Sequence, residues 1–220
     1  MPAHLVLRFI LLPPEIFLFI IIFIITHQIE IYAWIMLFAF IHELGHIFAG
    51  LILKLKPKTL ELMPLGVSIT FEVYEYKKLI EIKKILIALA GPLTNLLIIM
   101  IAIPLHISEN LKQMIIYSNV LIAVFNMIPI YPLDGGRILK GIIRIRRSEI
   151  KADEIINKTS NILIVLITAM SSIIVLYFKN IAIVFIIMYL WIMVIKQNKR
   201  FYMKKKAYKL LGKSEKCIDI

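Results

Sequence analysis

Residues 32–53 form an almost wholly apolar segment in which Glu43 is the only acidic or basic residue besides two histidines. A run of about 20 apolar residues is long enough for an α-helix to cross the hydrocarbon core of a bilayer. Similar segments follow, hydrophobic residues make up 60% of the 220-residue chain, and the mean hydropathy is +0.88. This composition excludes an ordinary soluble domain. We therefore predict an all-α polytopic membrane protein.

Six transmembrane helices are predicted from the apolar segments and from the prolines and charged residues that separate them. Cytoplasmic loops of membrane proteins carry an excess of Lys and Arg. All but two of the 26 Lys and Arg residues fall in alternate compartments of the six-span layout, which places both termini in the cytoplasm. The predicted spans cover about residues 15–28, 31–53, 84–105, 113–128, 159–178 and 180–196.

Two segments depart from the helical pattern. Residues 57–80 contain prolines, a glycine and partial alternation, which predicts a small membrane-associated β element, and residues 5–12 are a candidate additional strand. Irregular backbone at membrane depth requires packing against protein or a water-filled cavity. Two interpretations stay open for this element: it captures an unwound substrate strand by edge pairing, or it is a simple interfacial hairpin.

His42, Glu43 and His46 form an HExxH motif inside the second predicted span. Residues four apart lie on one face of a helix, so both imidazoles can bind a single Zn²⁺, and Glu43 can take a proton from metal-bound water. The alternative is a pair of hydrogen-bonded core histidines. The chain has only five histidines, and ionisable residues inside a span usually mark function, so the zinc site is favoured. The single cysteine, Cys217, excludes a cysteine-based metal site.

Asp134 is the best candidate for a third ligand, because a catalytic zinc usually takes three protein ligands. It follows Pro129 and Pro132 and precedes Gly135 and Gly136, which together favour non-helical backbone. An amphipathic helix is expected to begin directly afterwards. The alternative role of Asp134 is therefore to cap that helix, but the HExxH motif favours the ligand.

Together these residues resemble the site-2 protease family of intramembrane zinc metalloproteases, of the peptidase M50 type. The family pairs an HExxH motif in one span with an aspartate of an Asp-Gly motif in a later span, and both are present here in that order. The resemblance implies His42, His46 and Asp134 as zinc ligands and Glu43 as the general base. Residues 91–95 also resemble a Gly-Pro-x-x-Asn element of the family, in which we expect the asparagine to pack helices together.

Residues 62–66 and 129–136 are similar to the sporulation branch of this family, which processes the sigma factor precursor pro-sigma-K in the mother-cell membrane around the forespore. The resemblance implies a pro-sigma-K-like protein substrate and small membrane-protein inhibitors as partners. It also implies that Asn126 and Pro132 contact the substrate. The alternative for Asn126 is a helix cap or a hydrogen bond between helices.

Residues 1–196 are expected to form the protease domain, and residues 197–220 a basic amphipathic cytoplasmic tail. This short tail leaves no CBS domain, and the predicted loops have no room for a PDZ domain. The tail mixes aromatic and basic residues, which is compatible with nucleic-acid binding. Because it begins where the chain leaves the membrane, contact with anionic membrane lipids is favoured, and no nucleic-acid partner is expected despite the net charge of +12.

Three alternatives compete with a protease of the sporulation type. The first is a site-2 protease that cleaves another membrane substrate, such as an anti-sigma factor or a remnant signal peptide. The second is a metal transporter that uses the same three ligands, although a transporter would not need Glu43 and often has inverted repeats, which the sequence does not show. The third is an inactive scaffold, which the complete set of catalytic residues disfavours.

Overall fold

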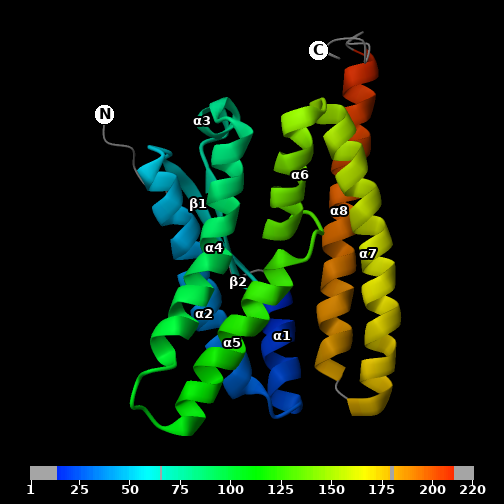
Figure 1. Cartoon of the computed structure of the whole chain (residues 1–220). Helices are drawn as coiled ribbons and strands as arrows, with labels where there is room; N and C mark the ends of the chain where they lie inside the picture. Colours follow the sequence, from blue (N-terminus) through cyan, green and yellow to red (C-terminus); the bar gives the residue numbers. More distant parts are fainter. Residues whose placement is uncertain (1–13, 65, 179–180, 211–220) are drawn as a thin grey trace. The chain divides into compact units, whose positions relative to one another are not determined.

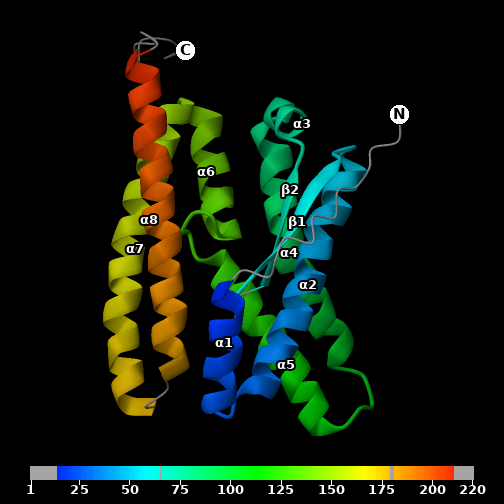
Figure 2. The same ribbon diagram turned by 180° about the vertical axis from the view of Figure 1, so that it is seen from behind.

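The computed structural model describes residues 14–64, 66–178 and 181–210, which form eight helices and one β-hairpin (Figures 1 and 2). The chain divides into two compact units, the first ending at Met127 and the second beginning at Ile128. The elements are α1 (Pro14–Ile25), α2 (Ile29–Ile52), β1 (Pro57–Met63), β2 (Gly66–Phe71), α3 (Val73–Lys78), α4 (Glu81–Ala102), α5 (Glu109–Met127), α6 (Asp134–Arg146), α7 (Glu149–Phe178) and α8 (Ile181–Leu210).

Among the described residues, four helices are long and apolar enough to cross a membrane. These are α2, α4, and nearly all of α7 and α8 (Glu149–Tyr177 and Ala182–Tyr208). The predicted spans at 15–28 and 113–128 also coincide with helices, but α1 has only 12 residues and α5 is not among the four. The protein is therefore a mostly helical multi-pass membrane protein with four candidate spans and a two-stranded sheet.

The first unit is built on three mutually packed helices, α2, α4 and α5. Phe38 and Ala39 of α2 form a buried cluster with Ile122 of α5. Gly45 allows α2 to approach α4 closely, because a Cβ at this position would collide with the Thr94 side chain and lie 3.0 Å from a backbone carbonyl oxygen of α4. The face of α2 that carries the two motif histidines therefore packs tightly in protein.

The hairpin of β1 and β2 lies along α2 in the same unit (Figure 2). Met63 pairs with Gly66, whose φ of +142° is a conformation that glycine adopts readily. The Tyr32 hydroxyl donates to the Pro64 carbonyl at 2.9 Å and so fixes the turn to α2. The predicted β element is therefore present, and it packs on protein as expected for irregular backbone at membrane depth.

The strand prediction is wrong for the last part of residues 57–80, because the chain turns into the short helix α3 after Phe71. Glu75 lies in the first turn of α3, and Lys77 and Lys78 lie in its last turn, a charge order that suits the helix dipole. Glu75 also accepts a hydrogen bond from the backbone N–H of Lys56 at 3.2 Å. The candidate strand at residues 5–12 lies outside the described residues.

In the second unit, α7 and α8 pack side by side as a hairpin, and α6 packs on α7 (Figure 1). Large side chains such as Ile164 and Leu190 are fully buried in this unit. Two polar contacts join the pair: the Trp191 indole N–H donates to the Thr168 hydroxyl at 2.9 Å, and the Asn198 amide donates to an amide oxygen of α7 at 2.9 Å. Polar contacts of this kind hold helices together in membranes.

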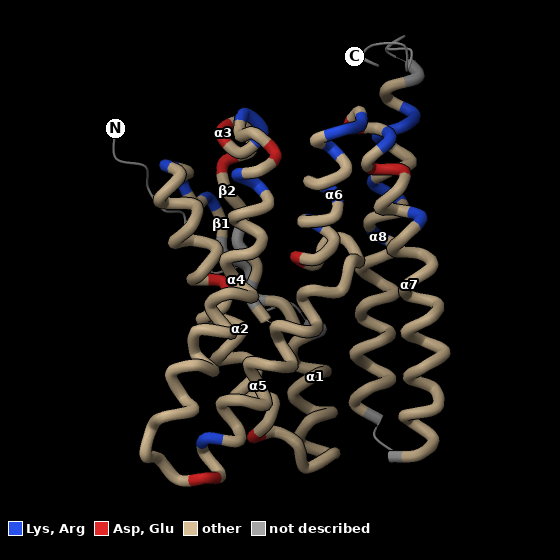
Figure 3. The backbone as a smooth tube through the Cα atoms, in the orientation of Figure 1, with Lys and Arg blue, Asp and Glu red and all other residues tan. Residues whose placement is uncertain are grey.

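Both helices of this pair extend beyond their predicted spans. α7 begins at Glu149, ten residues before the predicted start at 159, and α8 continues to Leu210 rather than ending at 196. Figure 3 shows that charged residues gather at this end of the second unit. Lys204 of α8 contacts the carboxylates of Glu149 and Asp153 on α7. The predicted tail is therefore, through residue 210, a continuation of α8 that is tied to α7 by ion pairs.

Candidate metal centre

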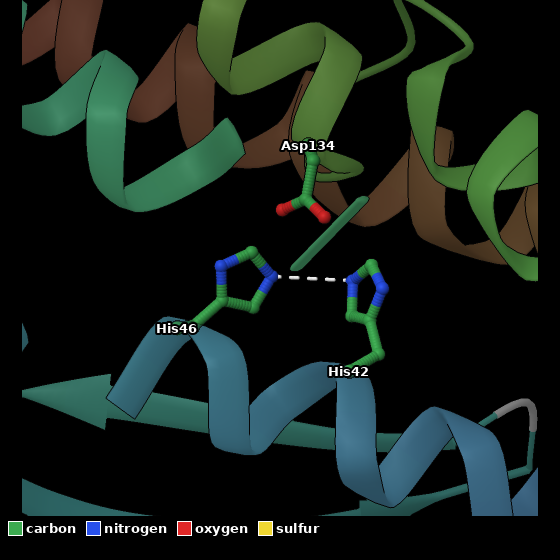
Figure 4. Close-up of side chains that lie close together, drawn as sticks. All are labelled: His42, His46 and Asp134. Carbon is green, nitrogen blue, oxygen red and sulfur yellow. Dashed lines mark hydrogen bonds between the residues drawn. The ribbon is translucent and has the colours of Figure 1, made fainter. Parts of the chain in front are cut away.

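His42 and His46 lie one turn apart on α2, and each side chain is only 2% exposed. Their rings are nearly perpendicular, at 82°, and their Nε2 atoms are 3.2 Å apart (dashed line in Figure 4). The HExxH spacing thus brings one nitrogen of each imidazole to the same point beside the helix.

The other ring nitrogen of each histidine contacts an oxygen acceptor. His46 Nδ1 is 2.7 Å from the Ile87 carbonyl oxygen, and His42 Nδ1 contacts the Asn95 amide oxygen. A carbonyl oxygen only accepts hydrogen bonds, so each Nδ1 carries the proton and each neutral ring presents a lone pair at Nε2. In these tautomers the two Nε2 atoms cannot hydrogen-bond to each other.

The two Nε2 atoms are spaced to bind one tetrahedral zinc ion through their lone pairs. Zinc–imidazole bonds of about 2.0–2.1 Å at a tetrahedral angle separate two ligand nitrogens by about 3.3 Å, close to the 3.2 Å between His42 and His46. Hydrogen bonds from the distal Nδ1–H to oxygen acceptors are the usual support of zinc-binding imidazoles. The donor set and its supports therefore suit a metal better than a pair of structural histidines.

Asp134 is the first residue of α6 and is 4% exposed. The N-cap position belongs to Leu133, so Asp134 stands one residue inside the helix rather than at its N-cap. Gly136 is required here, because a Cβ at this position would lie 2.5 Å from the Tyr131 backbone nitrogen. Tyr131 in turn donates its N–H to the Ser160 hydroxyl at 3.1 Å, which anchors the segment before Asp134 to α7.

His42, His46 and Asp134 each offer one possible metal-ligand atom. All three side chains are buried, and the role of Asp134 as the third ligand stays a prediction. Two nitrogens and one carboxylate oxygen are a donor set that zinc accepts, with a fourth position left for water.

Gly91 of α4 is a feature of the site whose role the sequence did not reveal. A Cβ at this position would collide with the Nε2 atoms of both histidines and would lie 2.6 Å from His46 Cε1. The sequence indicated here only a Gly-Pro-x-x-Asn element, which lies within α4 (Glu81–Ala102). A glycine inside a helix often has a packing reason, and here that reason is space for the metal-facing edges of the imidazoles.

The structure also places the other predicted site residues. Glu43 follows His42 on α2 and is half-buried. Asn126 lies near the end of α5 and donates its amide N–H to the Ile122 carbonyl of its own helix at 3.1 Å. Pro132 follows a cis peptide bond in the segment before α6 and is half-buried. The catalytic role of Glu43 and the substrate contacts of Asn126 and Pro132 stay predictions.

Comparison with known proteins finds likenesses to metalloproteases. Residues 105–170 match Peptidase family M50, and this range includes Asp134 but not the HExxH motif. The chain is 29% identical over 109 residues to the stage IV sporulation protein FB of Bacillus subtilis (strain 168) and 28% identical over 122 residues to a zinc metalloprotease of Methanocaldococcus jannaschii. These alignments cover 48% and 52% of this chain but only 37% and 34% of the relatives, so the chain spans about a third of their length.

The fold resembles that of a solved structure, the site-2 protease from Methanocaldococcus jannaschii, with a TM-score of 0.66. The match covers 84% of this chain and 88% of the other, at 21% sequence identity. Fold and site together indicate a multi-pass membrane protein with a candidate zinc site. The chain is therefore similar to Peptidase family M50 over residues 105–170 and to metalloprotease relatives over about half of its length.

Proposed function

We propose that this chain is an intramembrane endopeptidase that hydrolyses a peptide bond in or near the bilayer, with His42, His46 and Asp134 as zinc ligands. The observation that carries the proposal is the buried histidine pair, with Nε2 atoms 3.2 Å apart and both Nδ1 atoms on oxygen acceptors. Zinc bound there would polarise the scissile carbonyl and supply an activated water.

Glu43 is the general base of this proposal. It follows His42 on α2 and is half-buried, and the HExxH motif assigns it this role. It takes a proton from the attacking water as the oxygen–carbon bond forms. It then gives that proton to the leaving amide nitrogen as the carbon–nitrogen bond breaks, which balances the hydrolysis.

The proposed substrate is a pro-sigma-K-like precursor, from which the enzyme removes the pro-sequence. Support comes from the likeness of residues 62–66 and 129–136 to the sporulation branch, and from 29% identity to a relative whose name places it in stage IV of sporulation. By the same likeness, the enzyme acts in the mother-cell membrane and is controlled by small membrane-protein inhibitors. Cleavage of an anti-sigma factor or a remnant signal peptide, and metal transport without proteolysis, are the competing functions.

A six-span topology with both ends in the cytoplasm completes the proposal. In it, α1 and α5 cross the bilayer together with the four longer helices. The alternation of Lys- and Arg-rich with nearly Lys- and Arg-free compartments supports this layout. The basic end of α8 then lies at the cytoplasmic surface, where its exposed cations contact anionic lipid.

Co-expression with the sigma-K precursor of the same genome tests the function. Wild type, Glu43→Gln and the matched control Glu30→Gln, an exposed change on the same helix, are compared by product size. We expect cleavage by wild type and by Glu30→Gln only. Equal cleavage by Glu43→Gln would show that Glu43 is not the base.

A second substrate separates the competing functions. A remnant signal peptide fused to a reporter is co-expressed with the same three proteins. Cleavage of this fusion, but not of the sigma precursor, would transfer the assignment to the alternative substrate class. If zinc-loaded wild type cleaves neither substrate and instead moves zinc across vesicle membranes, the protein is a transporter.

A further inference from the structure

Two fully buried asparagines connect the metal-facing His42 to the backbone of a different helix. The Asn95 amide oxygen on α4 contacts His42 Nδ1, and the Asn95 amide nitrogen donates to the Asn119 amide oxygen on α5 at 2.8 Å. The Asn119 amide nitrogen donates in turn to the Ile115 carbonyl oxygen at 2.8 Å. Both asparagine side chains are 0% exposed, so these contacts are shielded from water.

The chemistry of these groups allows only one direction for the chain of hydrogen bonds. The Ile115 carbonyl is an acceptor, so the NH₂ of Asn119 faces it and the Asn119 oxygen faces Asn95. An oxygen there requires a donor, so the NH₂ of Asn95 faces Asn119 and the Asn95 oxygen faces His42. His42 must then donate from Nδ1.

We propose that Asn95 and Asn119 form a relay of positioning residues that holds His42 in the tautomer with its lone pair at Nε2, ready to bind zinc. Neither asparagine touches the metal in this proposal. The relay transmits the fixed orientation of a backbone carbonyl through two amides to the imidazole. It rests on the proposed metal site but not on the proteolytic reaction.

The choice of amides follows from the environment. Metal-bound imidazoles often donate to a carboxylate. A carboxylate that is fully buried within a membrane span is costly to keep charged, whereas an amide oxygen accepts the same hydrogen bond without a charge. An amide, however, brings an NH₂ that also needs a partner when it is buried. Asn119 supplies that partner, which explains why two asparagines rather than one lie between the helices.

Helix packing alone is the competing explanation, because polar side chains commonly join membrane helices. Ser118 provides a matched control. It neighbours Asn119 on α5 and is equally buried, at 0% exposed, and its hydroxyl has no hydrogen-bond partner among the described residues. A change at Ser118 therefore disturbs the same helix interface without breaking the relay.

The test measures zinc affinity of the full-length chain in detergent, by competition with a chromophoric chelator, together with the Co²⁺ absorption spectrum and the melting temperature of the metal-free protein. The variants are Asn119→Leu, Asn119→Asp, Asn95→Leu and Ser118→Ala. Asn119→Leu is decisive because Asn119 does not contact the histidine. The neutral acid form of Asn119→Asp can still donate to the Ile115 carbonyl and accept from Asn95, so it preserves the direction of the relay.

We expect Asn119→Leu and Asn95→Leu to weaken zinc binding by roughly 10–100-fold, the usual effect of losing an outer-shell partner. The Co²⁺ spectrum should change in both, Asn119→Asp should recover most of the affinity, and Ser118→Ala should bind as wild type. Wild-type affinity in Asn119→Leu, or an equal loss in Ser118→Ala, would overturn the relay. If Asn95→Leu does not fold, the comparison of Asn119→Leu with Asn119→Asp still tests the relay. A chain that binds zinc but cleaves nothing would refute the protease and leave the relay intact.

Discussion

Adding one methyl group at Gly91 should damage the metal centre more than its small size suggests. In the Gly91→Ala variant, the new Cβ would lie 2.6 Å from His46 Cε1 and would also overlap the Nε2 atoms of both histidines. Carbon atoms in contact normally lie about 3.5–4.0 Å apart, so α4 or the imidazoles must move by about 1 Å. The backbone of the helix and the hydrogen bonds at both Nδ1 atoms resist such a shift.

The magnitude follows from the displacement. A misplacement of about 1 Å at a catalytic site can cost about 100-fold in rate, which corresponds to about 2.7 kcal/mol of lost transition-state stabilisation. We expect kcat/KM for a cleavable reporter to fall by about that factor, and zinc affinity to fall with it. The assay compares purified wild type, Gly91→Ala and Leu93→Ala, a control whose side chain is 52% exposed on the same helix.

Folding must be checked separately, because an overpacked core typically loses about 1–3 kcal/mol of stability. A cooperative melting transition in Gly91→Ala shows that the protein is folded, and the loss of activity can then be attributed to the site. Leu93→Ala should keep near-wild-type activity and zinc. Wild-type activity and zinc content in a folded Gly91→Ala variant would refute the close packing of α4 on the histidine pair.

Three further predictions concern the supports of the site and its metal. Ser160→Ala leaves the partly buried Tyr131 N–H without its acceptor and should lower the free energy of unfolding by about 1 kcal/mol. Ser172→Ala, an exposed change on the same helix, should not lower it, and equal melting curves for both variants would count against the contact. Lys204→Ala removes the cation that joins α8 to two carboxylates of α7 and should lower the melting temperature by roughly 2–4 °C. The control Lys206→Ala, at an exposed position of the same helix, should leave the melting temperature unchanged. An equal drop in both variants would exclude a specific ion-pair effect. A zinc chelator should abolish cleavage, and added zinc should restore it; continued turnover by metal-free protein would contradict a zinc mechanism.

Local sequence patterns predicted the helices and the relation between the two histidines. Long apolar runs specify helices in a membrane because every backbone polar group must be paired within the segment. The spacing of four between His42 and His46 specifies a shared helix face, and the structure places their Nε2 atoms together. The turn residues around Gly66 likewise indicated a hairpin.

The parts that the sequence did not predict depend on contacts between distant residues. Gly91 was noted only as part of a Gly-Pro-x-x-Asn element, and its proximity to the histidines becomes visible only when α4 is packed on α2. Asn95 was expected to join helices, and its hydrogen bond to His42 spans 53 positions of the chain. The charged start of α7, from Glu149, lies outside the span predicted from the sequence, because its ion pairs with Lys204 cannot be inferred from local hydropathy.

Metal analysis of the purified full-length chain tests the central claim most directly. Wild type, His42→Ala and Glu43→Gln are isolated in detergent, and zinc per chain is measured by elemental analysis alongside the melting temperature. We expect one zinc per chain in wild type and in Glu43→Gln, and none in a folded His42→Ala variant, because the histidine is a ligand and the glutamate is not. Zinc that is absent from wild type, or that persists unchanged in His42→Ala, would contradict the metal centre.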